Sequence, residues 1–351
     1  MTHYKSVNIN FIKAVHMMIA VMLLSLNSHS AHAIKLKISA LSPDGSSWIE
    51  KLKQGADEIA EKTSGRVTFK FYPGGVMGSD KTVMRKMQTG QLHGAVFSNG
   101  TLNNIYSGSQ VYNLVLKFNS YDEIDYIRSK IDPMINEGIH KQGYTVLGLS
   151  ELGFAYLMST SPISSIDDLK KQKAWVPENN TTAAEAMKAF SITPIPLPLQ
   201  DVLVALQTGM VNVVAGSPVG AITLQWHTKI DYVTDLPIAY VYGGLLLSNR
   251  AMKKISSADQ EIVKSVMQGV THNLDKLTRE NNKNAITAMK NQGVEWVTPT
   301  EGTAAQLKSM IKTANKNLAV TTKMDKDIID SLEHYLDEFR HHPQAANQVQ
   351  F

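Results

Sequence analysis

The chain has 351 residues, no cysteine and a formal net charge of +4 at pH 7, with acidic and basic residues interspersed along its length. The absence of cysteine excludes thiol catalysis and cysteine-ligated metals. A nearly neutral chain without a basic block is not typical of a protein that binds nucleic acid.

The first 33 residues have the three-part layout of a secretory signal peptide. Lys5 and Lys13 provide positive charge, residues 14–26 form an uncharged apolar run, and Ala31-His32-Ala33 fits the small-x-small cleavage pattern. A membrane anchor is the alternative, but a run of about 13 residues is shorter than the roughly 20 that span a bilayer. We therefore predict cleavage after Ala33 and export to the periplasm.

Strand and helix patterns alternate in the first part of the mature chain. Apolar and polar residues alternate in the predicted strands, and apolar residues recur three and four positions apart in the predicted helices. The strands are predicted at 34–38, 66–72 and 93–97, and the helices at 46–63 and 80–88. This order is typical of an α/β layer with parallel strands.

A unit of helix, glycine and strand occurs twice in the sequence. Gln88-Thr89-Gly90-Gln91-Leu92 matches Gln207-Thr208-Gly209-Met210-Val211, and in both the glycine can end a helix in the left-handed conformation. Each unit leads into an apolar strand, which ends in Ser98-Asn99-Gly100 or in Gly216-Ser217-Pro218. A strand at 191–197 precedes the second unit. The match predicts two similar α/β lobes, and chance similarity is the alternative.

A long helix is predicted from Ser256 to Gln292, where Gly293 ends it. At about 1.5 Å per residue it is roughly 50 Å long, which exceeds one lobe, so we expect it to brace both lobes. Two helices hinged at Gly269 are the alternative. Three segments follow: helices at 303–319 and 325–339, and a polar tail at 341–351. We expect the tail to be flexible.

Motifs for catalysis or phosphate binding do not occur in the sequence. There is no G-x-S-x-G nucleophile motif and no G-x-x-x-x-G-K phosphate loop, and the glycine-rich segment 72–78 is interpreted as a turn. Asp167-Asp168 follow Ser164-Ser165 and are interpreted as helix-start residues rather than paired catalytic carboxylates. The histidines are scattered. We therefore expect no enzyme activity, no metal and no cofactor.

Several segments of the chain resemble the periplasmic receptor subunits of TRAP (tripartite ATP-independent periplasmic) transporters. The resemblance covers nearly the whole mature chain. Its most specific stretches are Tyr72-Pro73-Gly74-Gly75-Val76-Met77-Gly78, Ile166-Asp167-Asp168-Leu169-Lys170 with Val176-Pro177, and Pro194-Ile195-Pro196-Leu197 through Thr208-Gly209. The resemblance implies a receptor that closes on a small organic solute, usually an organic acid. It also implies delivery of this solute to membrane permease subunits driven by an ion gradient.

The resemblance implies a periplasmic-binding-protein-like α/β fold, with two lobes around a cleft and the long helix bracing both. We assign residues 34–152 and about 241–282 to lobe I, and residues 153–240 and about 283–340 to lobe II. We expect the receptor to be a monomer or a weak dimer.

One departure from the family pattern bears on the ligand. The family commonly has Lys-x-Arg-Val-Pro, whose arginine holds the ligand carboxylate with a planar, two-pronged guanidinium. The matching segment is Lys173-Ala174-Trp175-Val176-Pro177, so Trp175 stands at the arginine position. A second arginine of some members falls near Ala155, and a family asparagine falls near Gly216-Ser217. The usual carboxylate clamp is therefore missing.

An indole in place of the arginine predicts a solute with apolar or aromatic surface. A carboxylate remains compatible, because backbone N–H groups at helix starts also bind anions. The candidate ligand-binding residues are Ser98, Asn99, Phe154, Tyr156, Trp175, Asn179, Leu199, Gly216, Ser217, Trp226, His227 and Tyr242.

Each aromatic candidate has a structural alternative. Trp175 can be a core residue at a strand end, Trp226 and His227 can serve lobe packing, and Tyr242 can belong to a strand that crosses between lobes. A carrier of a hydrophobic or lipid-like ligand, and an exported enzyme with an unrecognised site, are the alternative functions.

Overall fold

A computed structural model describes residues 33–178 and 180–341 of the chain. Its strands form one mixed sheet with the order β2-β1-β3-β9-β4-β7-β5-β6; β8 also pairs with β4, and β10 pairs with β8. The strands are β1 Ile34–Ala40, β2 Val67–Tyr72, β3 Gly94–Ser98, β4 Tyr144–Ser159, β5 Ala174–Pro177, β6 Pro194–Leu197, β7 Val213–Gly216, β8 Tyr232–Thr234, β9 Ala239–Ser248 and β10 Glu295–Val297.

Two parallel groups of strands make up the two ends of this sheet. β1 pairs in parallel with β2 and β3, and β5 pairs in parallel with β6 and β7, as the alternating pattern predicts. Pro194 and Pro196 lie in β6 at the edge of the sheet, where a missing backbone N–H removes no internal ladder bond. The α/β fold is therefore confirmed.

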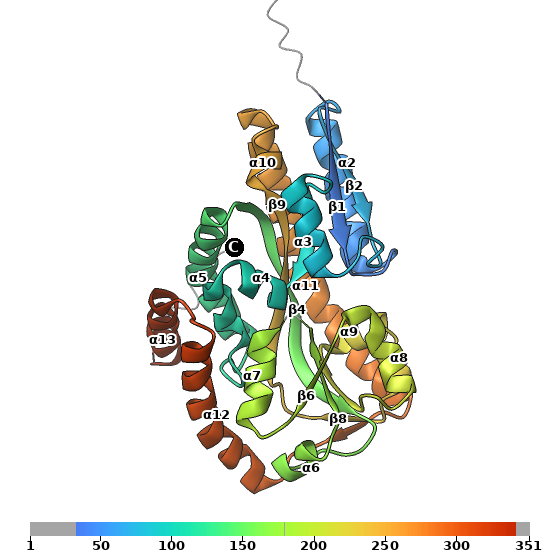
Figure 1. Cartoon of the computed structure of the whole chain (residues 1–351), viewed down its shortest axis with the longest axis vertical. Helices are drawn as coiled ribbons and strands as arrows, with labels where there is room; N and C mark the ends of the chain where they lie inside the picture. Colours follow the sequence, from blue (N-terminus) through green and yellow to red (C-terminus); the bar gives the residue numbers. More distant parts are fainter. Residues whose placement is uncertain (1–32, 179, 342–351) are drawn as a thin grey trace, which may run out of the picture. The chain divides into compact units, whose positions relative to one another are not determined.

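Strand β4 connects the two groups. It pairs antiparallel with β9 from Tyr144 to Ala155 and then antiparallel with β7 from Tyr156 to Ser159. The pairing with β9 contains two bulges, one of them between Glu151 and Gly153. β9 in turn pairs antiparallel with β3. Two antiparallel strands thus carry the chain from one parallel group to the other (Figure 1).

Helices flank the sheet on both faces (Figure 1). They are α2 Ser47–Lys62, α3 Asp80–Thr89, α4 Asn99–Ile105, η1 Ser107–Asn113 (a 3₁₀ helix), α5 Tyr121–Lys141, α6 Ile166–Lys170, α7 Thr181–Ala189, η2 Leu199–Asp201, α8 Val202–Gln207, α9 Pro218–Thr223, η3 Trp226–Thr228, α10 Asn249–Met252, α11 Ser257–Asn291, α12 Glu301–Thr321 and α13 Lys326–His341.

Local sequence signals explain where these helices begin and end. The Ser165 hydroxyl accepts from the Asp168 N–H and the Asp168 carboxylate accepts from the Ser165 N–H, which is a capping box at the start of α6. The helix-start interpretation of this aspartate pair is confirmed. Gly90 and Gly209 both have left-handed backbones, with φ of 81° and 67°, as the repeated unit predicts.

The long helix α11 is a single helix of 35 residues, so the hinge at Gly269 is wrong. It packs against β4 and α2 and, toward its C-terminal end, against α9. Its apolar side chains enter two different cores. Val263 and Met267 lie in the core of β1 and α2, whereas Met289 lies in the core that holds Trp175 and Trp226. The helix therefore braces both ends of the sheet, as predicted.

The last helix, α13, packs against α5 and η1. Leu332 and Leu336 are buried in the same core as Ile124 and Ile127 of α5. Phe154 and Tyr240, from the segment 153–240, belong to this core as well. The predicted lobe boundaries stay a prediction.

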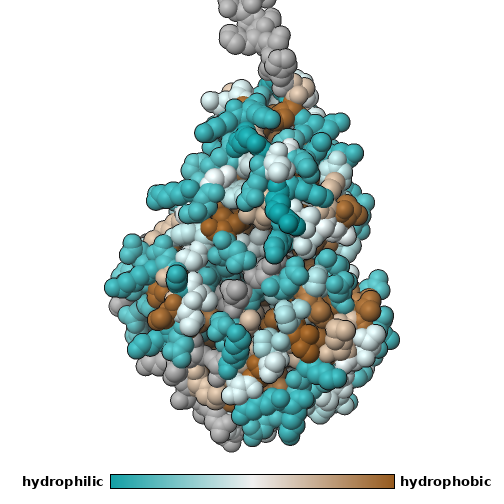
Figure 2. All heavy atoms as spheres, viewed as in Figure 1, coloured by the Kyte–Doolittle hydropathy of each residue, from teal (hydrophilic) through white to brown (hydrophobic). Residues whose placement is uncertain are grey.

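Figure 2 shows a mostly hydrophilic face with apolar residues scattered over it. Within the part of the chain that the structure describes, no helix has the length and apolar character needed to cross a bilayer. The predicted signal segment up to His32, the candidate Asn179 and the tail from residue 342 lie outside the described residues.

Candidate ligand-binding site

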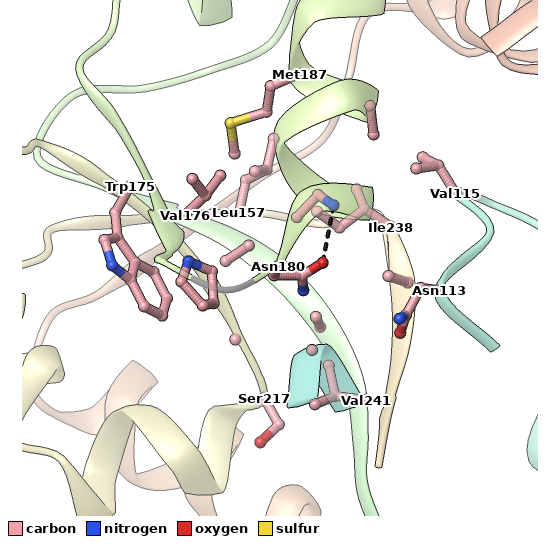
Figure 3. Close-up of a pocket in the computed structure, with 18 of the residues that line it drawn as sticks. Asn113, Val115, Leu157, Trp175, Val176, Asn180, Met187, Ser217, Ile238 and Val241 are labelled. Carbon is pink, nitrogen blue, oxygen red and sulfur yellow. Dashed lines mark hydrogen bonds between the residues drawn. The ribbon is translucent and has the colours of Figure 1, made fainter. Parts of the chain in front are cut away.

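A cavity of about 340 Å³ lies where β4 changes partner, and both groups of strands contribute to its wall. Most of the lining is apolar and comes from β4, β5, α7 and the segments that flank them; examples are Leu157, Ile163, Val176, Met187, Phe190 and Ile238. Figure 3 shows four of these side chains around the open centre. An apolar chamber with a few polar groups on its wall is typical of a site for a small organic molecule.

Trp175 lines this cavity and is also a core residue, with 4% of its surface exposed. Its indole meets Trp226 edge to face, and its Nε1–H donates to the Leu197 carbonyl oxygen at 3.0 Å. Trp175 is therefore a core residue whose ring also borders the cavity, and its contact with a ligand stays a prediction. Because the Nε1–H is already bonded to β6, Trp175 offers a ligand apolar ring surface rather than a hydrogen bond.

Six further predicted residues line the same cavity. They are Ser98, Asn99, Leu199, Gly216, Ser217 and Trp226. Ser98 and Ser217 precede α4 and α9, and the Ser217 hydroxyl accepts from the Gly220 N–H at 3.3 Å. The two loops of the repeated unit therefore border one cavity.

Four predicted residues lie outside the cavity lining: Phe154, Tyr156, His227 and Tyr242. Side chains alternate along a strand, and Ala155 and Leu157 of β4 and Val241 of β9 are the ones that face the cavity. Their neighbours Phe154, Tyr156 and Tyr242 therefore point to the opposite face.

Three of these residues contact other parts of the fold. Phe154 packs against Tyr121 with the rings tilted and against Tyr240 edge to face. The buried Tyr242 hydroxyl donates to the Ser109 carbonyl oxygen at 2.8 Å. The His227 Nδ1 lies 3.2 Å from the Ala221 carbonyl oxygen.

A buried carboxylate, Asp80, belongs to the site although the sequence patterns did not single it out. It lies in the first turn of α3, is 8% exposed, and lines the cavity. Its Oδ2 accepts from the Thr101 hydroxyl and from the Ser98 hydroxyl, the latter at 3.4 Å. Burial raises the pKa of Asp80, the two hydroxyl donors lower it, and the nearby Glu178 raises it; the net pKa shift is upward.

Asparagine side chains complete the polar part of the wall. The Asn99 Nδ2–H donates to the Asn113 Oδ1 at 2.5 Å, and the Asn180 Oδ1 accepts from the Ala183 N–H at 2.9 Å at the start of α7 (Figure 3). Asn113 is 8% exposed, and its Nδ2 has no hydrogen-bond partner among the described residues. A helix-start pattern before residue 181 was the only sequence signal for Asn180, and none pointed to Asn113.

No lysine, arginine or histidine lines the cavity within the described part of the chain, and Asp80 and Glu178 are its charged side chains there. Two partly buried arginines are engaged elsewhere. Arg128 pairs with Asp132 and Asp275, and Arg279 pairs with Asp125 and Glu151. Nothing among the described side chains replaces the carboxylate clamp that the Trp175 position lacks.

Comparison with known proteins places the chain in a family. Residues 38–321 match the model of the bacterial extracellular solute-binding proteins of family 7 (DctP). The uncharacterised protein YiiZ of Salmonella typhimurium is 24% identical over 78% of this chain and 84% of its own. The sialic acid-binding periplasmic protein SiaP of Vibrio cholerae is 22% identical over 80% of this chain and 88% of its own.

Solved structures of TRAP periplasmic solute-binding proteins share the fold. The protein of Desulfovibrio salexigens with bound orotic acid has a TM-score of 0.81 at 18% identity. The match covers 87% of this chain and 99% of that chain. The protein of Xanthobacter autotrophicus with bound β-D-galacturonate has a TM-score of 0.79, also at 18% identity, over 86% of this chain and 99% of its own.

The chain belongs to family 7 of the bacterial extracellular solute-binding proteins. Its two-ended α/β sheet and bracing helix are those of the TRAP periplasmic receptors, which confirms the resemblance read from the sequence. The relatives give no support to the alternatives of a hydrophobic carrier or an exported enzyme.

Proposed function

We propose that this protein is the solute receptor of a TRAP-type transporter and not an enzyme. It captures a small organic solute in the periplasm and delivers it to the membrane permease subunits. The observation that carries the proposal is the cavity of about 340 Å³, which has walls from both groups of strands. A solute that contacts both groups binds the closed arrangement more tightly than the open one, and so it shifts the protein toward closure.

The connecting strands supply a place for this movement. β4 and β9 carry the chain between the two groups, and β4 is irregular there, with a bulge next to Gly153. Irregular strand positions can absorb changes of backbone angle that a regular ladder resists. The position of the cavity beside this crossing supports a closure that is driven by the bound solute.

The solute proposed for this cavity has apolar or aromatic surface. Two relatives are named for acids, sialic acid and, in Escherichia coli, 2,3-diketo-L-gulonate. This chain has Trp175 at the clamp position and an apolar chamber around it. Burying apolar solute surface against these walls is favourable by roughly 25 cal/mol per Å².

Export and assembly complete the proposal. We propose cleavage of the signal peptide after Ala33, a mature protein in the periplasm, and a monomer or weak dimer that contacts no nucleic acid. SiaP and the 2,3-diketo-L-gulonate-binding relative from Escherichia coli are both named as periplasmic proteins, which supports the location.

The proposal is tested with purified protein that starts at Ile34. A thermal-shift screen of small organic solutes should give a saturable rise in melting temperature, because a ligand that binds only the folded state stabilises it. Isothermal titration then measures the affinity, and mass spectrometry of the mixture shows whether the solute is chemically unchanged. Conversion of the solute to a product would contradict the receptor proposal.

A pair of substitutions on α7 assigns the binding to this cavity. Ala186 lines it, so Ala186→Phe should fill the chamber and abolish binding. Ala184 lies on the same helix but outside the lining, so Ala184→Phe is the matched control and should keep the affinity. Equal binding by both variants would place the solute elsewhere.

A further inference from the structure

The charge of the cavity wall bears on which solutes can bind. Its described charged side chains are two carboxylates, Asp80 and Glu178, and the described lining contains no basic side chain. Asp80 is the buried one of the two, and a carboxylate ligand beside it would bring a second buried negative charge to a lining without a basic side chain. Burial of unpaired charge and the approach of like charges are both unfavourable.

Asp80 is built into the wall as an acceptor. The Ser98 and Thr101 hydroxyls both donate to its Oδ2 and hold the carboxylate against the first turn of α4. A carboxylate can accept about four hydrogen bonds, so two donors leave it capacity for a ligand. A carboxylate accepts only, which means that the matching ligand group must donate an N–H or O–H.

Asn113 is the complementary donor beside the same turn. Its Oδ1 accepts from Asn99, which follows Ser98, so Asp80 and Asn113 are both tied to the start of α4. The Asn113 Nδ2 is buried and has no partner among the described residues, and Figure 3 shows Asn113 across the chamber from Trp175. Buried N–H groups are almost always paired in native proteins, so an acceptor on the ligand would complete this one.

The apolar part of the chamber restricts the rest of the molecule. Trp175 and Trp226 present ring surface, and Met187 and Phe190 of the α7 segment face the same space. The polar wall at α4 and the apolar wall at the tryptophan pair are thus on different sides of one cavity. A ligand that fits has a polar end and an apolar body.

From this arrangement we infer that the solute carries a neutral or cationic polar end with an N–H or O–H donor, such as an amide or an amine, on an apolar body, and is not a free carboxylic acid. Its N–H or O–H donates to Asp80, and an acceptor oxygen, where the solute has one, accepts from Asn113. The inference rests on the proposed receptor function, because it assigns the ligand class of the same cavity.

The test uses probes that differ only in the polar end. 3-Phenylpropylamine, 3-phenylpropionamide and 3-phenylpropionate share one apolar body, and indole-ethyl and cyclohexyl-ethyl sets repeat the comparison. Titration of the mature protein at pH 7 should show the amine or the amide of at least one set binding ten-fold or more tightly than the acid. An acid that binds as tightly as its amine and amide partners would overturn the inference.

Substitutions link the preference to the named groups. Asp80→Asn should weaken binding of the tighter-binding amine or amide probe at least ten-fold. It should also reduce the ratio between the affinity for this probe and the affinity for the matching acid. Asp57→Asn, at an exposed acid on α2, is the matched control and should leave the affinity unchanged. Unchanged amine affinity in Asp80→Asn would overturn the role of Asp80.

The failure of this inference and the failure of the receptor proposal give different results. Acids that bind tightly, and are blocked by Ala186→Phe, would keep the receptor and overturn the preference for a donor-bearing solute. Absence of binding by every acid, amide and amine in the three sets would overturn the inference, whereas absence of a response to every solute in the thermal-shift screen would overturn the receptor proposal.

Discussion

Trp175 and Trp226 meet edge to face in the wall of the cavity, with ring centroids 5.2 Å apart and ring planes inclined at 73°. The pair joins β5 to the 3₁₀ helix η3, and Ala205, Val214 and Met289 share its core. Ring pairs in this geometry stabilise a fold beyond the area that they bury. The residue at the family's clamp position therefore supports the second group of strands as well as the site.

Substitution of Trp175 should accordingly lower stability as well as affinity. Trp175→Ala is expected to cost about 3–5 kcal/mol of unfolding free energy because it leaves a large cavity. Trp175→Phe keeps a ring but leaves the Leu197 carbonyl without its donor, which costs about 1–3 kcal/mol. Urea unfolding measures both. Trp296→Phe, at a half-buried tryptophan on β10, is the control; a Trp175→Ala protein as stable as this control would contradict the core role.

Asp80→Asn should stabilise the ligand-free protein at pH 7. The pKa of Asp80 is raised on folding, so the folded state holds this proton more tightly than the unfolded chain does. The stability from Asp80 is therefore fully present below the unfolded pKa, near 3.8, and is lost as pH rises through the raised folded pKa. We expect a gain in unfolding free energy at pH 7, because asparagine removes a buried charge that the folded state disfavours.

The pH dependence of this gain is the check. The difference in unfolding free energy between Asp80→Asn and the natural protein should be largest at pH 7 to 8 and should shrink as pH falls through the folded-state pKa of Asp80. Asp57→Asn provides the baseline for an exposed acid. A variant that is less stable than the natural protein at every pH would show that the carboxylate is a structural anchor.

Removing Arg279 should destabilise the crossing between the strand groups. Its guanidinium contacts the fully buried Glu151 at 2.7 Å and Asp125 at 2.6 Å, and the Tyr240 hydroxyl donates to the same Glu151 at 2.8 Å. Arg279→Gln leaves a buried carboxylate without its cation, which costs about 3–5 kcal/mol.

Two variants make this ion-pair prediction specific. Adding Glu151→Gln to Arg279→Gln should recover much of the loss, because no buried charge then remains unpaired. Lys188→Gln, which breaks an exposed pair with Glu185, should change stability by less than about 1 kcal/mol. Denaturant midpoints measure all three. Equal stability of the single Arg279 and Lys188 variants would contradict the importance of burial.

Gly153 should not tolerate a side chain. Its φ is +94°, and an added Cβ would lie 2.5 Å from the Asn282 Nδ2 and 2.9 Å from the Tyr121 hydroxyl oxygen. Asn282 cannot move freely, because its Nδ2–H donates to the Leu152 carbonyl and its Oδ1 accepts from the Val219 N–H. Gly153→Ala should therefore lose more than the roughly 1–2 kcal/mol that the left-handed backbone alone costs.

Gly143 supplies the control for that comparison. Its φ is +93° with nothing within 4 Å of an added Cβ, so Gly143→Ala isolates the backbone cost. Thermal unfolding of both variants gives the difference that is due to the Asn282 contact. Equal losses would show that the Asn282 and Tyr121 side chains yield at little cost.

Much of the fold could be predicted because its signals are local. Alternating patterns located β1 and β2, apolar residues at helical spacing located α2, the long run that Gly293 ends located α11, and Gly90 and Gly209 adopt the backbone expected of them. Gly269 failed as a hinge signal because one glycine costs a helix only about 1 kcal/mol relative to alanine. Packing of α11 on β4 and α2 is enough to offset that cost.

The site could be predicted only in part. Which alternate side chains of a strand face the cavity depends on how the strand pairs in the fold, and the sequence does not show that pairing. Phe154, Tyr156 and Tyr242 were chosen for their ring chemistry, but Ala155, Leu157 and Val241 occupy the cavity-facing positions. The bulge between Glu151 and Gly153 resets the alternation of β4, and no sequence pattern reveals a bulge in advance. Asp80 was not predicted for a different reason. An aspartate in the first turn of a helix is common because it interacts favourably with the helix dipole, so its presence there does not indicate a binding site.

The change of partner along β4 has a mechanical consequence. Ala155 is the last β4 residue paired with β9, Tyr156 is the first paired with β7, and Ala155 and Leu157 both line the cavity. In the proposed closure, a solute at this place would contact the strand about which the two strand groups turn. A small change of twist there would move the edge strands β2 and β6 through a much longer arc, so a contact of atomic size would become a displacement at the periphery.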